Sequence, residues 1–584
     1  MARRRKSAGS SPLGKSSAST SSRLTIAQHL AYLIPDLSPE KWKPGSANAP
    51  VWPPDTFALT ASLLHMSGAY TVAVRLSRVR QPDWASRTRE LGEKWRKDYQ
   101  RSDTMPVVLK EWWDVLLQHT ATPVEEIYRN ERLCEALLLL CAAADEASRG
   151  IARPPRGNLE LDSFDAESIR LLANRECEKF GSTLCKSIHP SRVRVLPKFH
   201  TPQSGLTIRS MSHHLALCPV GEVKPFYTQL PTRPDLDSLN LLLLPWPERT
   251  TPAQFFEVSG AEVLRQGRYR AFRYEAPKLR ADLPQRVGDI MDCAKELVGP
   301  VDGVIFPELA LRPKEYDRIV PVVVERDAFL LCGVACEVPG DAEKKLPGSN
   351  YLQFCMRSAG LFTVPFQQYK HHRWVLDKNQ VIQYGLGGRL NPAYPYAEHI
   401  GPAERTLNFF ALRPALSVCA LICEDLARPD PVADVIRAVG PNLVIALLMD
   451  GPQLVSRWPA RYATVLADDP GSSVLTLTAL GMAELSRPLT EPKTSRAIAL
   501  WKDAQRGGPY QIELPLGAAG VVLSLAVERH EEWTADGRSD TAAGKEHLRG
   551  YPILTGVHPV IERRRQRRPA KSGPLAAIRR PRKA

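Results

Sequence analysis

The stretch LSVCALICEDL, residues 416–426, decides which fold class this sequence favours. Leu416–Ile422 is a mostly apolar run with the length of a buried β-strand. Cys423, Glu424 and Asp425 follow this run directly, so a thiol and two carboxylates lie where the strand ends. We therefore expect a buried strand whose end carries reactive groups, as in layered α/β proteins.

Two further stretches have the same form. In DGVIFPELAL, Glu308 follows the apolar run Gly303–Phe306. In LFTVPFQQYKHHRW, Lys370 follows the run Gly360–Val364 at a distance of a few residues. Because the ends of neighbouring strands meet at one edge of a sheet, we expect this carboxylate and this ammonium group to lie close to the thiol of Cys423.

Short apolar runs alternate with amphipathic segments through the whole second half of the sequence. The further expected strands are Leu239–Leu244, Ala328–Ala335, Leu443–Leu448, Val474–Leu480 and Val521–Val527. The expected helices are Arg286–Leu297 and Arg428–Val439. This alternation is typical of an α/β fold built in layers.

The rest of the 584-residue chain divides into regions of different composition. Residues 24–150 show helical spacing of apolar residues, and residues 151–235 are interrupted by prolines. We expect a mainly helical domain, then a Pro-rich connecting region or small irregular subdomain, and then the α/β domain over residues 236–560. Residues 1–23 and 563–584 have the composition of disordered basic tails.

The formal net charge of +15 comes from the ends of the chain. Residues 1–23 contain six Lys/Arg and residues 563–584 contain ten, with no acidic residue in either segment, so residues 24–562 are close to neutral. Such tails are either simply solvated or contact nucleic-acid phosphates weakly and without sequence preference, and both interpretations stay open. No apolar run approaches the ~18 residues needed to span a bilayer, so we do not expect a membrane protein.

Cysteine usage points to a reducing compartment. The 11 cysteines are sparse and odd in number, and residues 1–22 lack an apolar signal segment, so we expect a cytoplasmic location rather than a secreted disulfide scaffold. Possible zinc ligands are Cys177, Cys185, His189 and His200, but their spacings match no usual ligand pattern. We therefore expect no metal, and we expect no cofactor.

Glu308, Lys370 and Cys423 have the chemistry of a nucleophilic site. A free thiol is only slightly ionised at neutral pH, so Glu308 is placed to accept its proton and Lys370 to stabilise the thiolate and a developing oxyanion. A carboxylate and an ammonium group ~4 Å apart interact by ~4 kcal/mol at an effective dielectric constant of ~20. This exceeds the ~1.4 kcal/mol that shifts a pKa by one unit, so the groups are able to tune each other.

The three motifs together resemble those of the nitrilase, or carbon–nitrogen hydrolase, superfamily, whose members use a Glu–Lys–Cys triad on an α-β-β-α sandwich. The resemblance covers about residues 236–560. It includes LVIALLMDGPQLVSRWPARYATVLA, residues 443–467, which is similar to the strand, substrate loop and helix that follow the cysteine in this family. It implies that Glu308 is the general base, Lys370 the catalytic lysine and Cys423 the nucleophile.

The same resemblance suggests further site residues. Glu424 and Asp425 after the cysteine are typical of the amidase-like branch, and the Glu424 backbone N–H is the expected oxyanion donor. Family members often carry a second glutamate shortly after the lysine, and Asp377 is the shorter candidate in that neighbourhood. His371 and Asp450 are candidates for the substrate pocket.

Two functions are consistent with the sequence. The first is a hydrolase that cleaves an amide or carbamoyl carbon–nitrogen bond of a small molecule through a cysteine thioester. The alternative is a nitrilase-like binding or effector module, as in bacterial antiviral defence, that recruits protein or nucleic acid. The family resemblance further implies a homo-oligomer.

Overall fold

The structure is a computed structural model that describes most of the chain. The described residues are 23–35, 49–72, 83–154, 162–230, 238–258, 269–279, 281–335, 348–358, 361–362, 365–487, 495–540 and 550–562. Apart from residue 23, both expected basic tails lie outside these ranges. Within them, no helix has the length and apolar character needed to cross a membrane.

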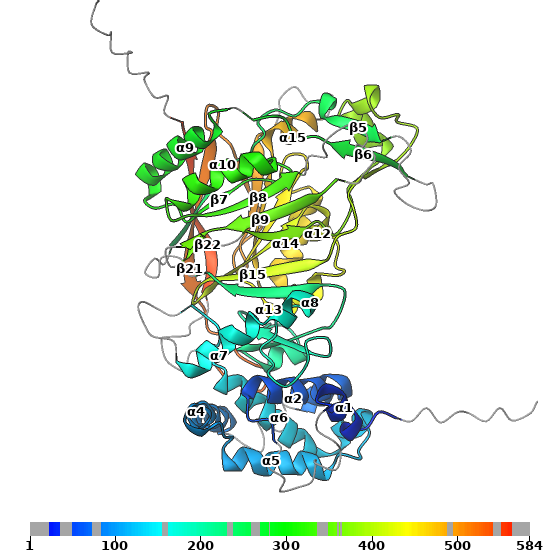
Figure 1. The fold of residues 1–584 in the computed structure, drawn as a ribbon, viewed down its shortest axis with the longest axis vertical. Coiled ribbons are helices and arrows are strands. Elements are labelled where there is room, and N and C mark those ends of the chain that lie inside the picture. The colour runs from blue at the N-terminus through cyan, green and yellow to red at the C-terminus, as the bar shows by residue number, and fades with distance from the viewer. Residues whose placement is uncertain are drawn as a thin grey trace, which may run out of the picture.

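Two mixed sheets of seven strands each form the centre of the molecule (Figure 1). In order, the first sheet consists of β12 (Phe366–Tyr369), β9 (Asn350–Cys355), β8 (Phe329–Ala335), β7 (Gly303–Ile305), β4 (Ser238–Leu243), β21 (Gly520–Arg529) and β22 (Gly550–Val560). The second consists of β20 (Tyr510–Glu513), β19 (Ala497–Lys502), β18 (Ser473–Thr478), β17 (Leu443–Leu448), β16 (Leu416–Ile422), β15 (Thr406–Arg413) and β3 (Lys224–Gln229).

The two sheets pack face to face. The rings of Phe354 from β9 and Phe410 from β15 stack with their centroids 4.1 Å apart. Side chains alternate between the two faces of a strand, and β4 shows the consequence. Leu241 and Leu243 enter the core between the sheets, whereas Leu242 joins the core under the helices of the first sheet.

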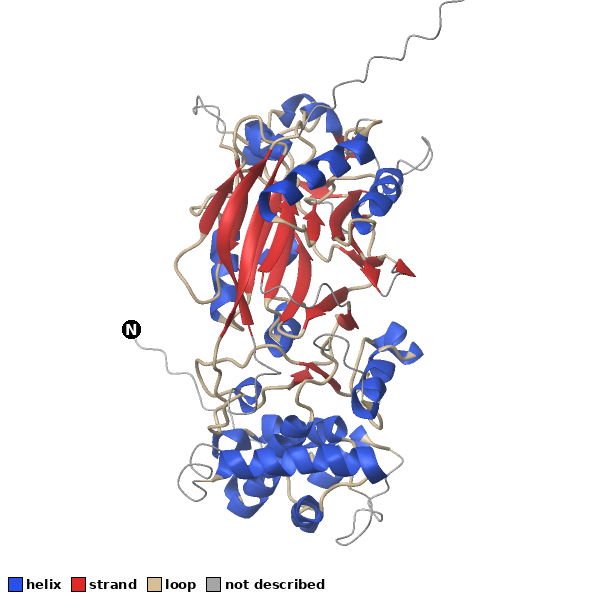
Figure 2. Cartoon of the chain, turned by 90° about the vertical axis from the view of Figure 1, so that its left-hand side faces the viewer, coloured by secondary structure: helices blue, strands red, loops and turns tan. Residues whose placement is uncertain are grey.

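Helices cover both sheets. α9 (Leu283–Val298) and α10 (Pro313–Val324) pack on the first sheet, and α13 (Ala433–Val439) and α14 (Trp458–Asp468) pack on the second. Figure 2 shows helices on both sides of the paired sheets. The layers therefore run α-β-β-α, and the expected fold class is confirmed.

Several expected elements differ in their bounds. The strands Leu416–Ile422 and Leu443–Leu448 are present as expected. The expected strand Val474–Leu480 ends at Thr478, because the helix α15 (Leu480–Leu485) begins two residues later. The expected helix Arg428–Val439 begins only at Ala433, since the prolines at 429 and 431 lack the backbone N–H that a helix interior needs.

Lys370 does not follow the strand that was expected before it. Of the expected strand Gly360–Val364, the described residues Leu361–Phe362 form the short β11, paired with β10 (Arg357–Ser358), and the remainder lies outside the described residues. Lys370 instead follows β12, which pairs antiparallel with β9 at the edge of the first sheet. A proline at 365 separates these two short strands.

A group of helices precedes the sandwich and lies at one end of it in Figure 1. They are α1 (Ile26–Leu33), α2 (Pro53–Ser67), α4 (Trp84–Ser102), α5 (Val107–Gln118) and α6 (Glu131–Ala147). α6 is the central member, because nearly all of its residues after the first turn are buried and it packs against α2, α4 and α5. α7 (Ser163–Leu172) and α8 (Arg175–Phe180) follow.

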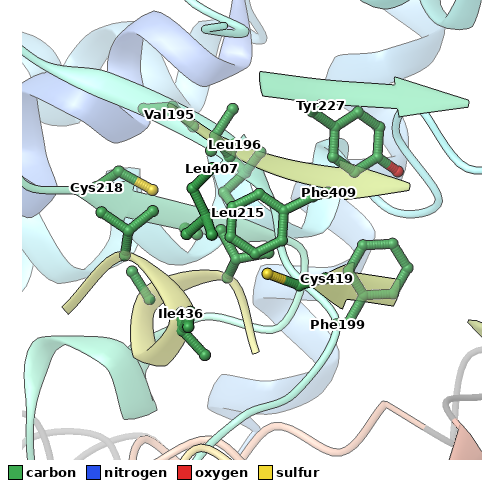
Figure 3. Close-up of a cluster of buried hydrophobic side chains, with 14 of the residues drawn as sticks. Val195, Leu196, Phe199, Leu215, Cys218, Tyr227, Leu407, Phe409, Cys419 and Ile436 are labelled. Carbon is green, nitrogen blue, oxygen red and sulfur yellow. The ribbon is translucent and has the colours of Figure 1, made fainter. Parts of the chain in front are cut away.

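The segment expected as a connecting region contributes to the sandwich itself. β1 (Arg194–Pro197) and β2 (Leu215–Cys218) pair antiparallel, and β3 pairs parallel with β15. Figure 3 shows Leu215 of β2 and Tyr227 of β3 in one apolar cluster with Phe409 of β15 and Ile436 of α13. Residues 151–235 are therefore more than a linker, because part of them completes the second sheet and its core.

Candidate active site

Cys423 occupies a strained turn between β16 and the one-turn helix α12 (Glu424–Ala427). Its backbone has φ +46° and ψ −109°, a conformation that side-chain-bearing residues rarely adopt. The Cys423 N–H still donates to the Leu447 carbonyl at 2.9 Å, so the β16–β17 ladder holds the turn in place. A tight turn of this kind at a strand end projects a side chain away from the sheet, which is also the geometry of the nucleophile elbow in α/β-hydrolases.

Glu308 follows β7 and lies against β8. Gly333 of β8 permits this approach, because a Cβ at that position would lie 2.5 Å from the Glu308 Cα. The Gly333 N–H donates to the Pro307 carbonyl at 3.2 Å, and the Ala310 N–H donates to the Gly333 carbonyl at 3.0 Å. The carboxylate is thereby held on a rigid backbone.

Lys370 lies between two carboxylates. Its Nζ donates to Glu308 Oε1 at 2.8 Å and to Glu398 Oε2 at 2.7 Å. Asn350 Nδ2 joins the same two side chains, donating to Glu308 Oε1 at 2.7 Å and to Glu398 Oε1 at 2.9 Å. Glu308 Oε1 thus accepts two hydrogen bonds, whereas the buried Glu308 Oε2 has no partner among the described residues.

The electrostatics keep Lys370 charged and the thiol protonated. Burial by itself lowers the pKa of Lys370, but the carboxylates of Glu308 and Glu398 raise it well above its usual value. Burial and the charge of Glu308 raise the pKa of the Cys423 thiol well above its usual value, and Lys370 opposes this shift. Burial also raises the pKa of Glu308. A nucleophilic thiolate at this position therefore requires proton transfer to a base.

Asp425 ties the lysine segment to the cysteine segment. Its Oδ1 accepts the backbone N–H of His371 at 3.1 Å and that of His372 at 2.9 Å. The His372 Nδ1 lies 2.9 Å from the same oxygen. The His371 ring contacts the Thr406 carbonyl through Nε2 at 3.0 Å, and its expected part in substrate binding stays a prediction.

The second carboxylate that pairs with the lysine is Glu398, and the expected part of Asp377 in substrate positioning stays a prediction. The exposed Asp377 caps the helix α11 (Lys378–Gln383), accepting the Gln380 backbone N–H at 2.8 Å. Glu398 comes from β14 (Tyr396–Glu398), which pairs parallel with β6 (Arg270–Tyr274) in a separate four-stranded sheet. Its only sequence signal is its place at the end of a short aromatic run.

Asp450 lies beside the cysteine, at the end of β17. Its Oδ1 accepts from Arg457 Nη2 at 2.7 Å, while Oδ2 makes no hydrogen bond of normal length with a described residue. Burial raises the pKa of the Tyr384 hydroxyl and that of the Cys423 thiol, and the charge of Asp450 adds to both shifts. Asp450, Arg457 and Tyr384 thus form a polar wall near the Cys423 sulfur.

One group of side chains has the spacing of a metal site among the residues that the structure describes. It comprises His213, Glu532 and Asp540, all buried, with ligand atoms within 4.8 Å of one another. The two ring nitrogens of His213 already contact Thr201 Oγ1 at 3.0 Å and the Arg538 carbonyl at 3.1 Å. This group therefore serves hydrogen bonding within the protein, away from Cys423.

No protein-family model and no curated protein sequence matches the chain. Solved structures similar to it include Nit3 of Saccharomyces cerevisiae, a member of branch 10 of the nitrilase superfamily, at 13% identity over 47% of this chain and 86% of Nit3, with a TM-score of 0.29. A mutant of the Nesterenkonia AN1 amidase is similar at 12% identity over 47% of this chain and 92% of the amidase, with a TM-score of 0.26. A carbon–nitrogen hydrolase from Helicobacter pylori G27 is similar at 10% identity, over 56% of this chain and 89% of that one, with a TM-score of 0.27.

Proposed function

We propose that the protein hydrolyses an amide or carbamoyl carbon–nitrogen bond of a small molecule, with Cys423 as nucleophile. The observation that carries this proposal is the arrangement of three groups. A buried thiol stands on a strained turn, a lysine beside it is held charged by two carboxylates, and one oxygen of Glu308 is left without a partner among the described residues. An ion pair with a purely structural role would not need a carboxylate oxygen that is left without a hydrogen-bond partner.

The first half of the proposed reaction forms a thioester. The Cys423 thiol transfers its proton to Glu308 Oε2 as the sulfur attacks the carbonyl carbon. The negative charge on the substrate oxygen is stabilised by the Lys370 ammonium and the Glu424 backbone N–H. The carbon–nitrogen bond then breaks, and the proton held by Glu308 passes to the leaving amine or ammonia.

The second half returns the enzyme to its starting state. Glu308 accepts a proton from water as the hydroxyl oxygen attacks the thioester carbon, and Lys370 again stabilises the oxyanion. The carbon–sulfur bond breaks, the acid leaves, and the proton on Glu308 returns to the Cys423 thiolate. Glu398 keeps Lys370 charged throughout, including when Glu308 is protonated, because it still pairs with the ammonium group.

The wall formed by Asp450, Arg457 and Tyr384 supports a substrate with polar groups near the scissile bond. The buried Asp450 Oδ2 forms no hydrogen bond of normal length with a described residue, although the Trp458 side chain lies beside the carboxylate. This oxygen suits an N–H donor, and the Arg457 guanidinium suits an acceptor. We therefore propose that substrates carry both a donor and an acceptor next to the amide. A simple aliphatic amide would leave the carboxylate oxygen unpaired.

The test is ammonia release from a panel of amides and carbamoyl compounds by wild type, Cys423→Ala and Cys419→Ala. Cys419 is the matched control, because it is also buried on β16 and contacts the core alone. We expect turnover in wild type and Cys419→Ala and an acyl adduct on Cys423 by mass spectrometry. Turnover that survives Cys423→Ala would refute the mechanism.

Three further expectations from the sequence remain proposals. They are the homo-oligomer, the cytoplasmic location and weak nucleic-acid binding by the basic tails. The molar mass in solution checks the first, and salt-dependent retention on DNA with and without residues 563–584 checks the last.

A further inference from the structure

A cavity of about 710 Å³ lies where the helical group meets the sandwich, away from Cys423. Three separate parts of the chain form it: α1 and α2, the β1–β2 hairpin with the short helix η4 (Ile208–Met211), and α13. Its volume falls within the ~300–1,000 Å³ that is usual for small-molecule sites. The mechanism proposed above makes no use of it.

The walls of this cavity are mostly apolar. Large apolar side chains at its rim remain exposed to solvent: Leu24 at 42%, Tyr32 at 55%, Met66 at 48% and Val220 at 45%. Single exposed apolar residues are ordinary, but several around one hollow mark a binding surface. The cavity is therefore suited to the apolar body of a ligand.

The buried end of the cavity is polar but uncharged. His29 lies there with its Nε2 2.8 Å from Ser62 Oγ. Burial lowers the pKa of His29 to about 4, so the ring is neutral at pH 7. A charged group of a ligand would find no opposite charge at this end, so its charged partner has to lie on another wall of the cavity.

A basic wall lies on the side of α13. Arg209 contacts Asp469 with both terminal nitrogens, at 2.6 and 3.0 Å, and Arg437 Nε lies 3.4 Å from the same carboxylate. Two guanidinium groups thus share one carboxylate. A second acid, Asp434, also lines the cavity, but it is 75% exposed and 3.9 Å from Arg437. The guanidinium group of Arg192 lines the cavity as well, so the charge around the cavity stays net positive.

We propose that this cavity binds a small amphipathic organic anion, whose apolar body fills the hollow and whose carboxylate or phosphate contacts Arg209 and Arg437. Guanidinium groups suit both anions, since their planar N–H donors match carboxylate and phosphate oxygens. The apolar walls exclude inorganic anions as the main ligand, because these would leave the cavity unfilled. The proposal is independent of the proposed hydrolase activity.

The site is tested by calorimetric titration of the full chain with octanoate, octyl phosphate and octan-1-ol. We expect at least one of the two anions to bind about tenfold more tightly than the alcohol, the value of one hydrogen bond to a charged group. The better of the two anions identifies the head group. Equal affinity for the three probes, or binding of none, would overturn the proposal.

Variants locate the binding. Arg437→Gln is expected to weaken anion binding about tenfold and to leave alcohol binding unchanged. Val220→Trp places a large side chain at the exposed rim, where it is compatible with folding, and is expected to abolish binding of all probes. Arg170→Gln is the matched control, because Arg170 is an exposed arginine that pairs with Glu167 on the surface. Wild-type anion binding in both Arg437→Gln and Val220→Trp would refute the site.

Discussion

Two clusters of buried charge can be compared in this molecule. In the Lys370 cluster, one lysine pairs with two carboxylates, Glu308 and Glu398, at 2.8 and 2.7 Å. In the Arg538 cluster, one arginine pairs with three carboxylates at 2.8 to 3.0 Å: Asp145, Glu146 and Asp536. Both are almost completely removed from solvent.

The Arg538 cluster is closed. The remaining guanidinium nitrogen donates to the Met211 carbonyl at 2.6 Å. Asp145 also accepts the backbone N–H groups of His213, His214 and Leu215. The cluster thereby joins α6, the segment before β2 and the segment after β21. The charged groups of the cluster are paired with one another and with backbone groups, and the cluster holds the helical group to the sandwich.

The Lys370 cluster is open on one side. Glu308 Oε2 has no described partner, and the strained Cys423 lies close enough for the charges of Glu308 and Lys370 to act on its thiol. The two clusters therefore differ in a feature other than buried charge. Of the two, only the Lys370 cluster leaves a buried acceptor without a described partner beside a thiol, which is what the proposed proton transfer requires.

The largest expected effect is on catalysis. Glu308→Gln keeps the hydrogen bonds of Oε1 but removes the base, so hydrolysis should fall by ~10²- to 10⁴-fold. The measurement is kcat/KM on the best substrate of the panel, with iodoacetamide labelling of Cys423 slowing in parallel. Glu146→Gln in the Arg538 cluster is the control and should leave kcat/KM unchanged. Equal losses in both variants would erase the distinction between the clusters.

Removal of the arginine should affect stability instead. Arg538→Met leaves three buried carboxylates without their cation, so the free energy of unfolding should fall by ~3–5 kcal/mol. Urea denaturation measures this, and Arg170→Met at an exposed, solvent-screened pair should change it far less. A loss in Arg538→Met as small as that in Arg170→Met would contradict a structural role for the cluster.

The buried imidazole of His29, which is neutral at pH 7, provides a third buried group whose effect on stability can be compared with that of the two charged clusters. Burial lowers the pKa of His29 from 6.5 to about 4, so between these two pH values the unfolded chain binds a proton at this ring and the folded chain does not. The stability from this group is complete above pH 6.5 and is lost as pH falls towards 4, by about 3 kcal/mol in all. Urea denaturation at about pH 7 and about pH 4.5, on either side of this window, should show a smaller difference in His29→Gln. Identical pH dependence in both proteins would exclude this assignment.

The smallest expected effect separates the two candidates for the second carboxylate. Asp377→Ala removes a helix cap and should cost ~1 kcal/mol of stability without changing hydrolysis. Glu398→Gln removes one of the two carboxylates that raise the pKa of Lys370, so that pKa should fall. The upper limb of the pH–rate profile should then move to lower pH. A shift in Asp377→Ala instead would support the assignment made from the sequence.

Local sequence is enough to locate the candidate nucleophile and the candidate base. β16 and β17 are continuous apolar runs because both are buried on both faces, and such runs are recognisable without knowledge of their neighbours. Cys423 and Glu308 can be located because each comes close after the end of an apolar run. β22 was missed, since prolines and glycines interrupt it, which the edge of a sheet tolerates.

Beyond the expected grouping of Glu308, Lys370 and Cys423, the further partners of these residues were decided by tertiary structure. Glu398 reaches Lys370 because β14 pairs with β6, a strand far earlier in the chain. Arg538 meets Asp145 across an even longer separation, and the cavity needs three distant segments at once. Apolar periodicity is a local property that each segment carries by itself. Which groups satisfy a buried charge depends on long-range strand pairing and packing, and no local pattern encodes that.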